Sequence, residues 1–183
     1  MNYYWSMPVR RILQLGDTSL RAISAPVESA REATPLLSDL RDTLHDFQRV
    51  HGFGRGISAV QIGDARRVIY LEFEGKPYIL INPELVWHST ATFRLWDDCF
   101  SFPELLVYLE RWYSVRVRYL DETAKQRELE AEGSLSELLQ HEIDHLDGIL
   151  AVDRAIDRNS LCTRDEYERR KAIPCGTGTG TPQ

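Results

Sequence analysis

The sequence has few cysteines, and no two of them have the CxxC spacing of a metal-binding or redox motif. Its three cysteines, Cys99, Cys162 and Cys175, are an odd number without a CxxC motif. This excludes the disulfide framework of a small secreted domain and suits a reducing compartment. We therefore expect a cytoplasmic protein in which a single cysteine can be functional.

The sequence also lacks long apolar runs and a positive net charge. No apolar segment approaches the roughly 20 residues that a helix needs to cross a bilayer. The N-terminal residues MNYYWSMPVRR contain no apolar core of a signal peptide. The formal net charge is −6, whereas general nucleic-acid binders are usually basic. We expect neither a membrane nor a nucleic acid as a partner.

The composition fits a single globular domain. The chain has 183 residues, of which 43% are hydrophobic and 27% are charged, enough to bury a core. We find no internal repeat. Residues 1–171 are expected to form one catalytic domain, followed by a flexible low-complexity tail over 172–183. We expect a monomer or a weak dimer.

Two segments have the hydrophobic spacing of helices. The first covers residues 35–50, with Pro35 as its first helical residue. The second and stronger one covers residues 134–148, with Gly148 as its natural end. Most apolar residues of the second helix are spread around its axis, which predicts that it is largely buried.

Short strands are expected between the two helices. β-Branched, aromatic or alternating residues mark four segments: 66–73, 77–83, 112–120 and 125–133. A glycine-rich loop over 51–56 precedes them. Helices and antiparallel strands in this mixture predict an α+β domain.

The motif QHEIDH on the second predicted helix indicates metal chemistry. Residues four apart share one face of a helix, so His141 and His145 can point at one ion. Glu142 lies beside them, where its carboxylate can take a proton from water. The alternative is a surface helix with two solvated histidines. A buried helix favours the metal, because neutral buried histidines need partners.

A third ligand separates the classes of enzyme that use this motif. Metzincins require a further histidine where this chain has Ala151, which excludes them. A thermolysin-like protein would use a downstream glutamate, for which Glu166 is a candidate. The other candidate is Cys99 in DDCFS, whose thiolate is a strong ligand for Fe²⁺ or Zn²⁺. A buried structural cysteine is the alternative at that position.

Three segments, in this order along the chain, resemble motifs of the peptide deformylase family. They are GRGISAVQ (54–61), DDCFS (97–101) and QHEIDH (140–145), the last without any change. The resemblance covers residues 12 to about 158. It implies a deformylase-like fold with antiparallel sheets packed around a central HExxH helix. It also implies one divalent metal ion, Fe²⁺ natively with Zn²⁺ or Ni²⁺ as substitutes.

The resemblance assigns roles to residues of the three motifs. Cys99, His141 and His145 would hold the metal. The reaction would hydrolyse a formamide bond, releasing formate from an N-formylated peptide or a small N-formyl amine. Glu142 would transfer the proton.

The oxyanion of this reaction needs hydrogen-bond donors in fixed places. The side-chain amide of Gln61 and the backbone N–H of Phe100 would supply them. Small residues before Gln61 would let an extended peptide pass close to the backbone. The residues expected to bind substrate are Arg55, Gly56, Ile57, Asp97, Glu137 and Leu138.

Four residues depart from the family's pattern around this pocket. Asp97 and Asp98 stand where the family has Glu-Gly, and Asp98 adds a negative charge beside the thiolate. Arg55 and Glu137 stand where the family usually has apolar residues. They predict either a buried ion pair or a pocket that recognises a polar group. The alternatives are a capping box of Ser134 with Glu137 and an Arg55 side chain turned to solvent.

These departures leave more than one function open. Charge in an apolar pocket disfavours a thioether side chain unless the charges are paired. A specialised deformylase of a non-methionine, polar or charged N-formyl substrate is therefore an alternative to a general one. A non-catalytic binding protein on the same scaffold is another, against which the intact ligands and Glu142 argue.

Overall fold

Two antiparallel sheets form the framework of the computed structural model, which describes residues 9–172. The larger sheet contains, in spatial order, β1 (Gly56–Ser58), β2 (Val68–Phe73), β3 (Lys76–His88), β6 (Ser114–Leu120) and β7 (Gln126–Glu132). The smaller sheet contains β4 (Thr92–Asp98), β5 (Leu105–Trp112) and β8 (Leu161–Thr163). The expected α+β class is confirmed.

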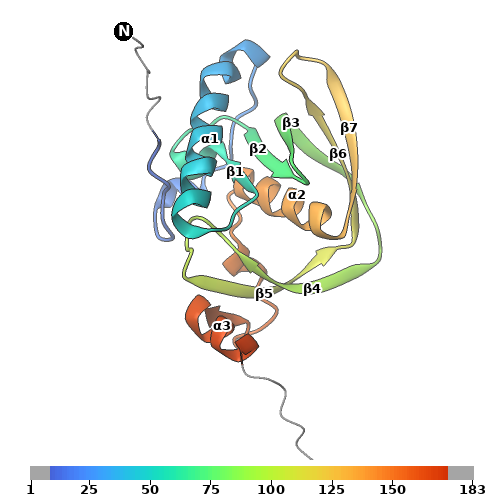
Figure 1. Ribbon diagram of the computed structural model, residues 1–183. Helices are drawn as coiled ribbons and strands as arrows, with labels where there is room; N and C mark the ends of the chain where they lie inside the picture. The colour runs from blue at the N-terminus through green and yellow to red at the C-terminus, as the bar shows by residue number, and fades with distance from the viewer. Residues whose placement is uncertain (1–8, 173–183) are drawn as a thin grey trace, which may run out of the picture.

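Helices fill and flank the space between these sheets (Figure 1). They are α1 (Ala30–His51), α2 (Gly133–Leu146) and α3 (Arg164–Ala172), with 3₁₀ turns at Thr18–Arg21, Ala59–Ile62 and Ala151–Arg154. Helix α2 is central and contacts strands of both sheets. Helix α1 covers one side of the larger sheet, and α3 follows β8 at the outer edge of the smaller one.

The core lies on both faces of the larger sheet. Helix α1 places Leu36, Leu40, Leu44 and Phe47 on one buried face, at the spacing seen in the sequence. Each fully buried leucine contributes about 1.5–3 kcal/mol. A second cluster packs the sheet's other face against the apolar side of α2. This packing holds α2, which carries the HExxH motif, in a fixed position.

Helix α2 is buried almost all round. Every residue from Ser136 to Leu146 is buried, including the polar ones. Buried polar side chains need hydrogen-bond partners. The polar residues of this helix therefore have to be satisfied by neighbouring elements, and this requirement shapes the site.

Helix α1 begins earlier than the sequence pattern predicted. Pro35 was expected to be the first helical residue, but the helix starts at Ala30 and contains Pro35. The prediction of its start was therefore wrong. Pro35 is the sixth residue of the helix and lacks the N–H that would bond the carbonyl of Arg31. The residues before it include Ala30 and Ala33, which are buried in the core. The helix ends at His51, where Gly52 adopts a left-handed conformation with φ 77°.

The strand predictions were correct in part. The segments 66–73, 77–83 and 125–133 are confirmed as β2, β3 and β7. The predicted strand 112–120 is divided, because Trp112 ends β5 and β6 starts at Ser114. Strands β4 and β5 were not predicted. They pair with each other along their whole length, and long-range pairing of this kind leaves little local signal.

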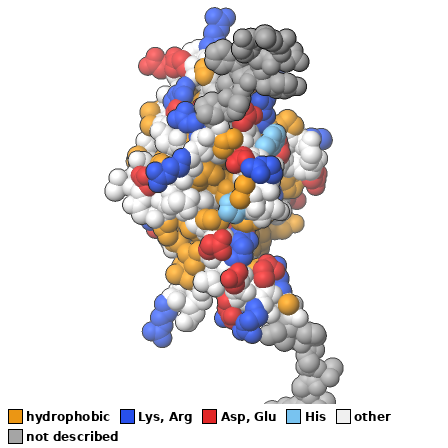
Figure 2. All heavy atoms as spheres, turned by 60° about the vertical axis from the view of Figure 1, so that its left-hand side comes forward, with side chains coloured by type: hydrophobic (Ala, Val, Ile, Leu, Met, Phe, Trp, Pro, Cys, Tyr) orange, Lys and Arg blue, Asp and Glu red, His pale blue; other side chains and the backbone are white. Residues whose placement is uncertain are grey.

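The surface on the side of α1 mixes hydrophobic, acidic and basic side chains (Figure 2). Among the residues that the structure describes, no helix combines the length and apolar character needed to cross a membrane. Apart from Ala172, which ends α3, the expected tail lies outside the described residues. The domain boundary at residue 171 stays a prediction.

Candidate metal centre

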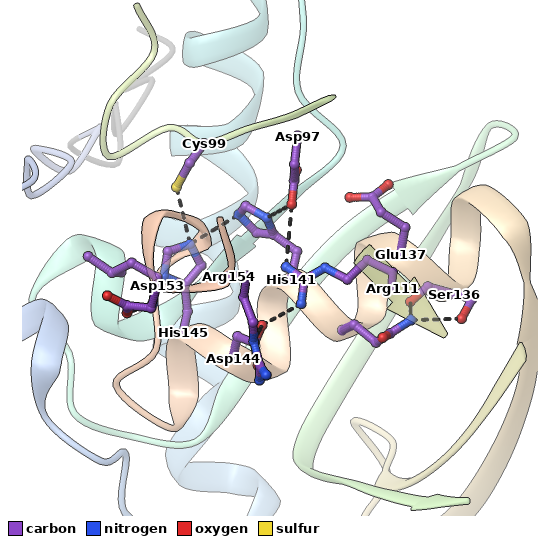
Figure 3. A network of polar contacts seen from close by, with 12 residues as sticks. Asp97, Cys99, Arg111, Ser136, Glu137, His141, Asp144, His145, Asp153 and Arg154 are labelled. Carbon is purple, nitrogen blue, oxygen red and sulfur yellow. Dashed lines mark hydrogen bonds and ion pairs between the residues drawn. The ribbon is translucent and has the colours of Figure 1, made fainter. Parts of the chain in front are cut away.

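Three side chains from two elements converge at the centre of the molecule (Figure 3). Cys99 follows the last residue of β4, and His141 and His145 lie one turn apart on α2. The Sγ atom of Cys99 lies 3.2 Å from Nε2 of His145. The Nε2 atoms of the two histidines are also 3.2 Å apart. All three residues are buried.

This arrangement fits a divalent cation. Ligand bonds of about 2.0–2.3 Å in a tetrahedral site place neighbouring ligand atoms roughly 3.4–3.6 Å apart. The observed separations of 3.2 Å are close to that spacing. Two imidazole nitrogens that face each other need a shared proton or a cation between them. The thiol and the two rings therefore form a metal site.

Buried charges behind the site orient the first histidine. Nδ1 of His141 lies 2.9 Å from the Asp97 carboxylate. Asp97 in turn accepts a hydrogen bond of 3.3 Å from Arg111, whose other amino group binds Asp144. A carboxylate on one ring nitrogen leaves the other nitrogen free to bind a metal. Asp97 thus supports the metal site as well as lining the cavity.

The pKa shifts follow from this layout. Burial favours a neutral Asp97, but His141 and Arg111 outweigh it and lower the pKa of that carboxyl. Burial also opposes a charged His141, yet the Asp97 carboxylate raises the pKa of this imidazole well above its ordinary value. For His145, burial lowers the pKa well below the ordinary value. This direction favours the neutral imidazole of His145, which is the form that binds metals.

Glu142 is held at the inner wall of the site. Its carboxylate is buried and lies 2.6 Å from the Ser58 hydroxyl, which donates a hydrogen bond to it. Burial raises the pKa of Glu142. A Cβ atom at Gly56 would stand 2.8 Å from the carboxylate, so only glycine leaves room there.

The Gln61 amide has a fixed orientation. Its oxygen accepts a 2.9 Å hydrogen bond from the backbone N–H of Ser58. Its nitrogen consequently points toward Cys99 Sγ, at 3.7 Å, and the Ser101 hydroxyl, at 3.4 Å. The NH₂ group is thus presented beside the metal ligands as a donor.

Arg55 and Glu137 form an ion pair at the same site. The Arg55 guanidinium lies 2.7 Å from the Glu137 carboxylate and 2.7 Å from the Ser134 hydroxyl. Burial and the Asp97 carboxylate raise the pKa of Glu137, and Arg55 opposes them. The alternative of a capping box was wrong, because α2 has no side-chain cap and both residues bind Arg55 instead.

A cavity of about 480 Å³ opens onto these groups. It is lined by the ligands Cys99 and His141, by the polar groups Gln61 and Glu142, and by five of the six residues expected to bind substrate: Arg55, Gly56, Asp97, Glu137 and Leu138. Phe100 also lines it. Ile57 does not, because its side chain is fully buried in the core beside α1. His145 lies behind the cavity wall.

Asp98 is neutralised by a residue that the sequence did not single out. Its carboxylate accepts a 2.8 Å hydrogen bond from Arg164, at the start of α3. The guanidinium of Arg164 also lies 3.9 Å from the centre of the Phe53 ring. The negative charge expected beside the thiolate is therefore compensated.

The other candidate for the third ligand does not reach the site. Glu166 lies on α3 and forms ion pairs with Arg169, at 2.7 Å, and Arg170, at 2.8 Å, of its own helix. Cys99 completes the group with His141 and His145. The thermolysin-like alternative is therefore wrong.

Comparison with known proteins decides the family. The model of the polypeptide deformylase family matches residues 9–160. This chain belongs to the polypeptide deformylase family. A peptide deformylase of Bartonella tribocorum is 38% identical over 155 residues, covering 80% of this chain and 84% of its own. Peptide deformylase 2 of Clostridium perfringens is 38% identical, covering 85% and 98%.

Solved deformylase structures share the fold. The peptide deformylase of Thermotoga maritima has a TM-score of 0.77 and 30% identity, covering 82% of this chain and 99% of its own. That of Synechococcus elongatus, solved with actinonin, has a TM-score of 0.78 and 28% identity, covering 92% and 90%. With the Cys99, His141 and His145 site in place, the chain is a metal-dependent hydrolase with peptide deformylase activity.

Proposed function

We propose that this deformylase removes the formyl group from the N-terminus of a peptide, with Glu142 moving the proton and Gln61 and Phe100 stabilising the oxyanion. The observation that carries this assignment is the placement of Glu142 and Gln61 in one cavity with the metal ligands Cys99 and His141. A nucleophile source, a base and an oxyanion donor are thus within one substrate's reach.

Cys99, His141 and His145 would hold the divalent cation. When bound, it supplies Lewis-acid chemistry that makes water acidic enough to react near pH 7. One thiolate and two imidazoles suit Fe²⁺, Zn²⁺ and Ni²⁺. We propose Fe²⁺ as the native ion, in line with the family resemblance.

Glu142 serves in both halves of the hydrolysis. It accepts a proton from the attacking water as the water oxygen bonds to the formyl carbon. It then gives this proton to the peptide nitrogen as the carbon–nitrogen bond breaks, leaving formate and a free amine. Burial raises the pKa of the Glu142 carboxyl. A carboxyl with a raised pKa is a better proton acceptor in the first step and can still donate the proton in the second.

Gln61 and Phe100 meet the charge that develops on the formyl oxygen. The Gln61 NH₂ group is held toward Cys99 by the bond from Ser58 to its amide oxygen. A donor that is fixed before the reaction costs no reorganisation during it. The backbone N–H of Phe100, next to the ligand Cys99, would supply a second donor.

The peptide chain of the substrate would align along β1. In the described part of the chain, β1 is the end strand of the larger sheet and pairs only with β2. An extended peptide can add to such an edge through main-chain hydrogen bonds. Gly56 lines the cavity at this edge, and its missing Cβ lets the Glu142 carboxylate lie against the strand.

The test is formate release from formyl-Met-Ala-Ser and other N-formyl peptides by protein loaded with Fe²⁺ under low oxygen. Glu142→Gln should lower kcat/KM by about 10²–10⁴-fold, and Gln61→Ala by roughly 10²–10³-fold. Neither change should alter the metal content. Glu168→Gln, on the exposed side of α3, is the control and should be neutral. Wild-type protein that binds metal but releases no formate from any N-formyl peptide would instead be a binding protein.

A further inference from the structure

An ion pair between Arg55 and Glu137 lines the cavity that also contains Cys99 and His141. Arg55 comes from the loop before β1, and Glu137 lies one helical turn before His141 on α2. Figure 3 shows the Glu137 carboxylate on the same side of α2 as the His141 ring. Carboxylate oxygens of Glu137 and Asp97 and a ring nitrogen of His141 lie within 4.8 Å of one another. The pair is therefore next to the place where the formyl group must react.

The position of the Arg55–Glu137 pair beside the metal ligands determines which part of a peptide substrate contacts it. The formyl carbon must approach Cys99, His141 and Glu142. The first side chain of the peptide is attached one atom beyond the formamide nitrogen. A side chain that enters the cavity from there lies against Arg55 and Glu137, which line the same cavity.

The pair as a whole is electrically neutral, because one guanidinium faces one carboxylate. The other carboxylates of the lining also have partners: the buried Asp97 binds Arg111 and His141, the half-buried Asp98 binds Arg164, and the buried Glu142 accepts a hydrogen bond from the neutral Ser58 hydroxyl. Among the described residues that line the cavity, Arg55 is the only one that is a lysine or an arginine. A substrate charge of either sign would leave one charge in this cavity without a partner.

The pair has hydrogen-bonding capacity that the protein does not use. A guanidinium has five N–H donors, and Arg55 directs three hydrogen bonds to Ser134 and Glu137. Only one oxygen of the Glu137 carboxylate, Oε2, is bonded to Arg55. The other has no hydrogen-bond partner among the described residues, although the side chain is only 3% exposed. The wall thus offers both a donor and an acceptor.

A thioether side chain cannot use this wall. It would displace water from the free groups of Arg55 and Glu137 without replacing the lost hydrogen bonds. A carboxamide, in contrast, offers an oxygen to Arg55 and an NH₂ group to Glu137. Glutamine and methionine side chains have nearly the same length, so the difference between them is one of polarity.

We propose that the Arg55–Glu137 pair selects N-formyl substrates whose first side chain is a neutral carboxamide, of which glutamine is the test case, over methionine. This inference rests on the proposed deformylase function and names the substrate class of the same site. Arg55 and Glu137 are its specificity-determining residues.

The experiment measures kcat/KM for formyl-Gln-Ala-Ser, formyl-Met-Ala-Ser, formyl-Glu-Ala-Ser and formyl-Lys-Ala-Ser. Wild-type protein should prefer the glutamine peptide to the methionine peptide by roughly tenfold or more. The Arg55→Leu/Glu137→Leu double variant should reverse this order. The matched control is Arg118→Leu/Glu128→Leu, which removes an exposed ion pair between β6 and β7 and should leave the ratio unchanged.

A second readout does not depend on turnover. Calorimetric binding of the same peptides to the Glu142→Gln variant should give the same order of affinities, and the pocket substitutions should change it in the same direction. If the double leucine variant does not fold, Glu137→Gln keeps the shape of the side chain. It removes one charge of the pair and should reduce the preference for the glutamine peptide.

The outcomes distinguish a failure of the carboxamide assignment from a failure of the proposed deformylase function. A wild-type preference for methionine, or for the lysine or glutamate peptide, overturns the carboxamide assignment while leaving the deformylase intact. A glutamine preference that survives in the double variant overturns the role of the pair. Absence of formate from all four peptides contradicts the proposed function, and the binding order then decides the specificity on its own.

Discussion

Asp97 shows how one carboxylate can serve the metal site without touching the metal. It joins Arg111 to the Nδ1 atom of His141 inside the protein. The bond to Nδ1 fixes the ring and makes Nε2 a better ligand. Arg111 is needed as well, because a buried carboxylate without a positive partner would be strongly destabilised.

This arrangement predicts a loss of metal affinity in the Asp97→Asn variant. The amide keeps the shape but not the charge, so Nε2 of His141 becomes a weaker ligand. We expect the affinity for Zn²⁺ to fall by about 10–100-fold, measured by competition with a chromophoric chelator. Asp98→Asn is the matched control, since Asp98 pairs with Arg164 and not with a ligand. An equal loss in both variants would mean that general charge, and not the bond to His141, sets the affinity.

For individual residues, the sequence predicted the metal ligands better than the residues that form hydrogen bonds and ion pairs around them. Cys99, His141 and His145 were predicted because each lies in a motif whose residues are adjacent in sequence. The bond from Ser58 to Glu142 joins residues 84 positions apart, and that from Arg164 to Asp98 spans 66. No local pattern encodes such pairs. The Arg55–Glu137 contact was one of several alternatives for these residues, and the fold was needed to choose it.

Among the elements, helix α2 is connected to strand β5 by hydrogen bonds from one side chain, that of Gln140. The Gln140 side chain accepts a 3.0 Å hydrogen bond from the backbone N–H of Trp112 and donates one of 2.9 Å to the carbonyl of the same residue. The amide thus pairs with the end of β5 as a neighbouring strand would. Through this attachment, the helix that carries two ligands is fixed to the sheet that carries the third.

Replacing Gln140 with leucine should therefore destabilise the protein. The N–H of Trp112 would lose its partner in a partly buried place, at a cost of about 1–3 kcal/mol, while its carbonyl would keep the bond from the Ser136 hydroxyl. Urea unfolding should show a lower midpoint with an unchanged slope. Gln126→Leu, on the exposed strand β7, should change the free energy of unfolding by less than about 0.5 kcal/mol. A similar loss in both variants would assign the effect to leucine itself.

The elements differ in how far the sequence could predict them. Helix α2 was predicted because its apolar spacing and its terminal glycine are local signals. Strands β2 and β3 have the β-branched residues typical of buried strands. Strand β4, with the sequence TFRLWDD, carries charge toward the cavity, and it exists because β5 pairs with it. Strands β4 and β5 were missed because distant partners stabilise them. Helix α3 was also missed, because none of its residues is buried and it therefore has no apolar periodicity.

On the scale of the whole molecule, the metal site joins parts of the chain that are far apart. Cys99 belongs to the end of the smaller sheet, while both histidines belong to α2 beneath the larger one. A cation bound by all three side chains would connect these layers. Because the site exists only in the folded chain, binding the metal stabilises the fold.

Metal loading should consequently raise the thermal stability. At a free metal concentration 100 times the Kd, the folded state gains about 2.7 kcal/mol. For a chain of this size, such a gain raises Tm by roughly 5–10 °C, measured by calorimetry with and without a chelator. Cys99→Ser should abolish most of this increment. Cys162→Ser removes the other buried cysteine of the described chain, which lies in β8, and should keep the increment even if the metal-free protein becomes less stable. Retention of the full increment in Cys99→Ser would show that the cation binds without the thiolate.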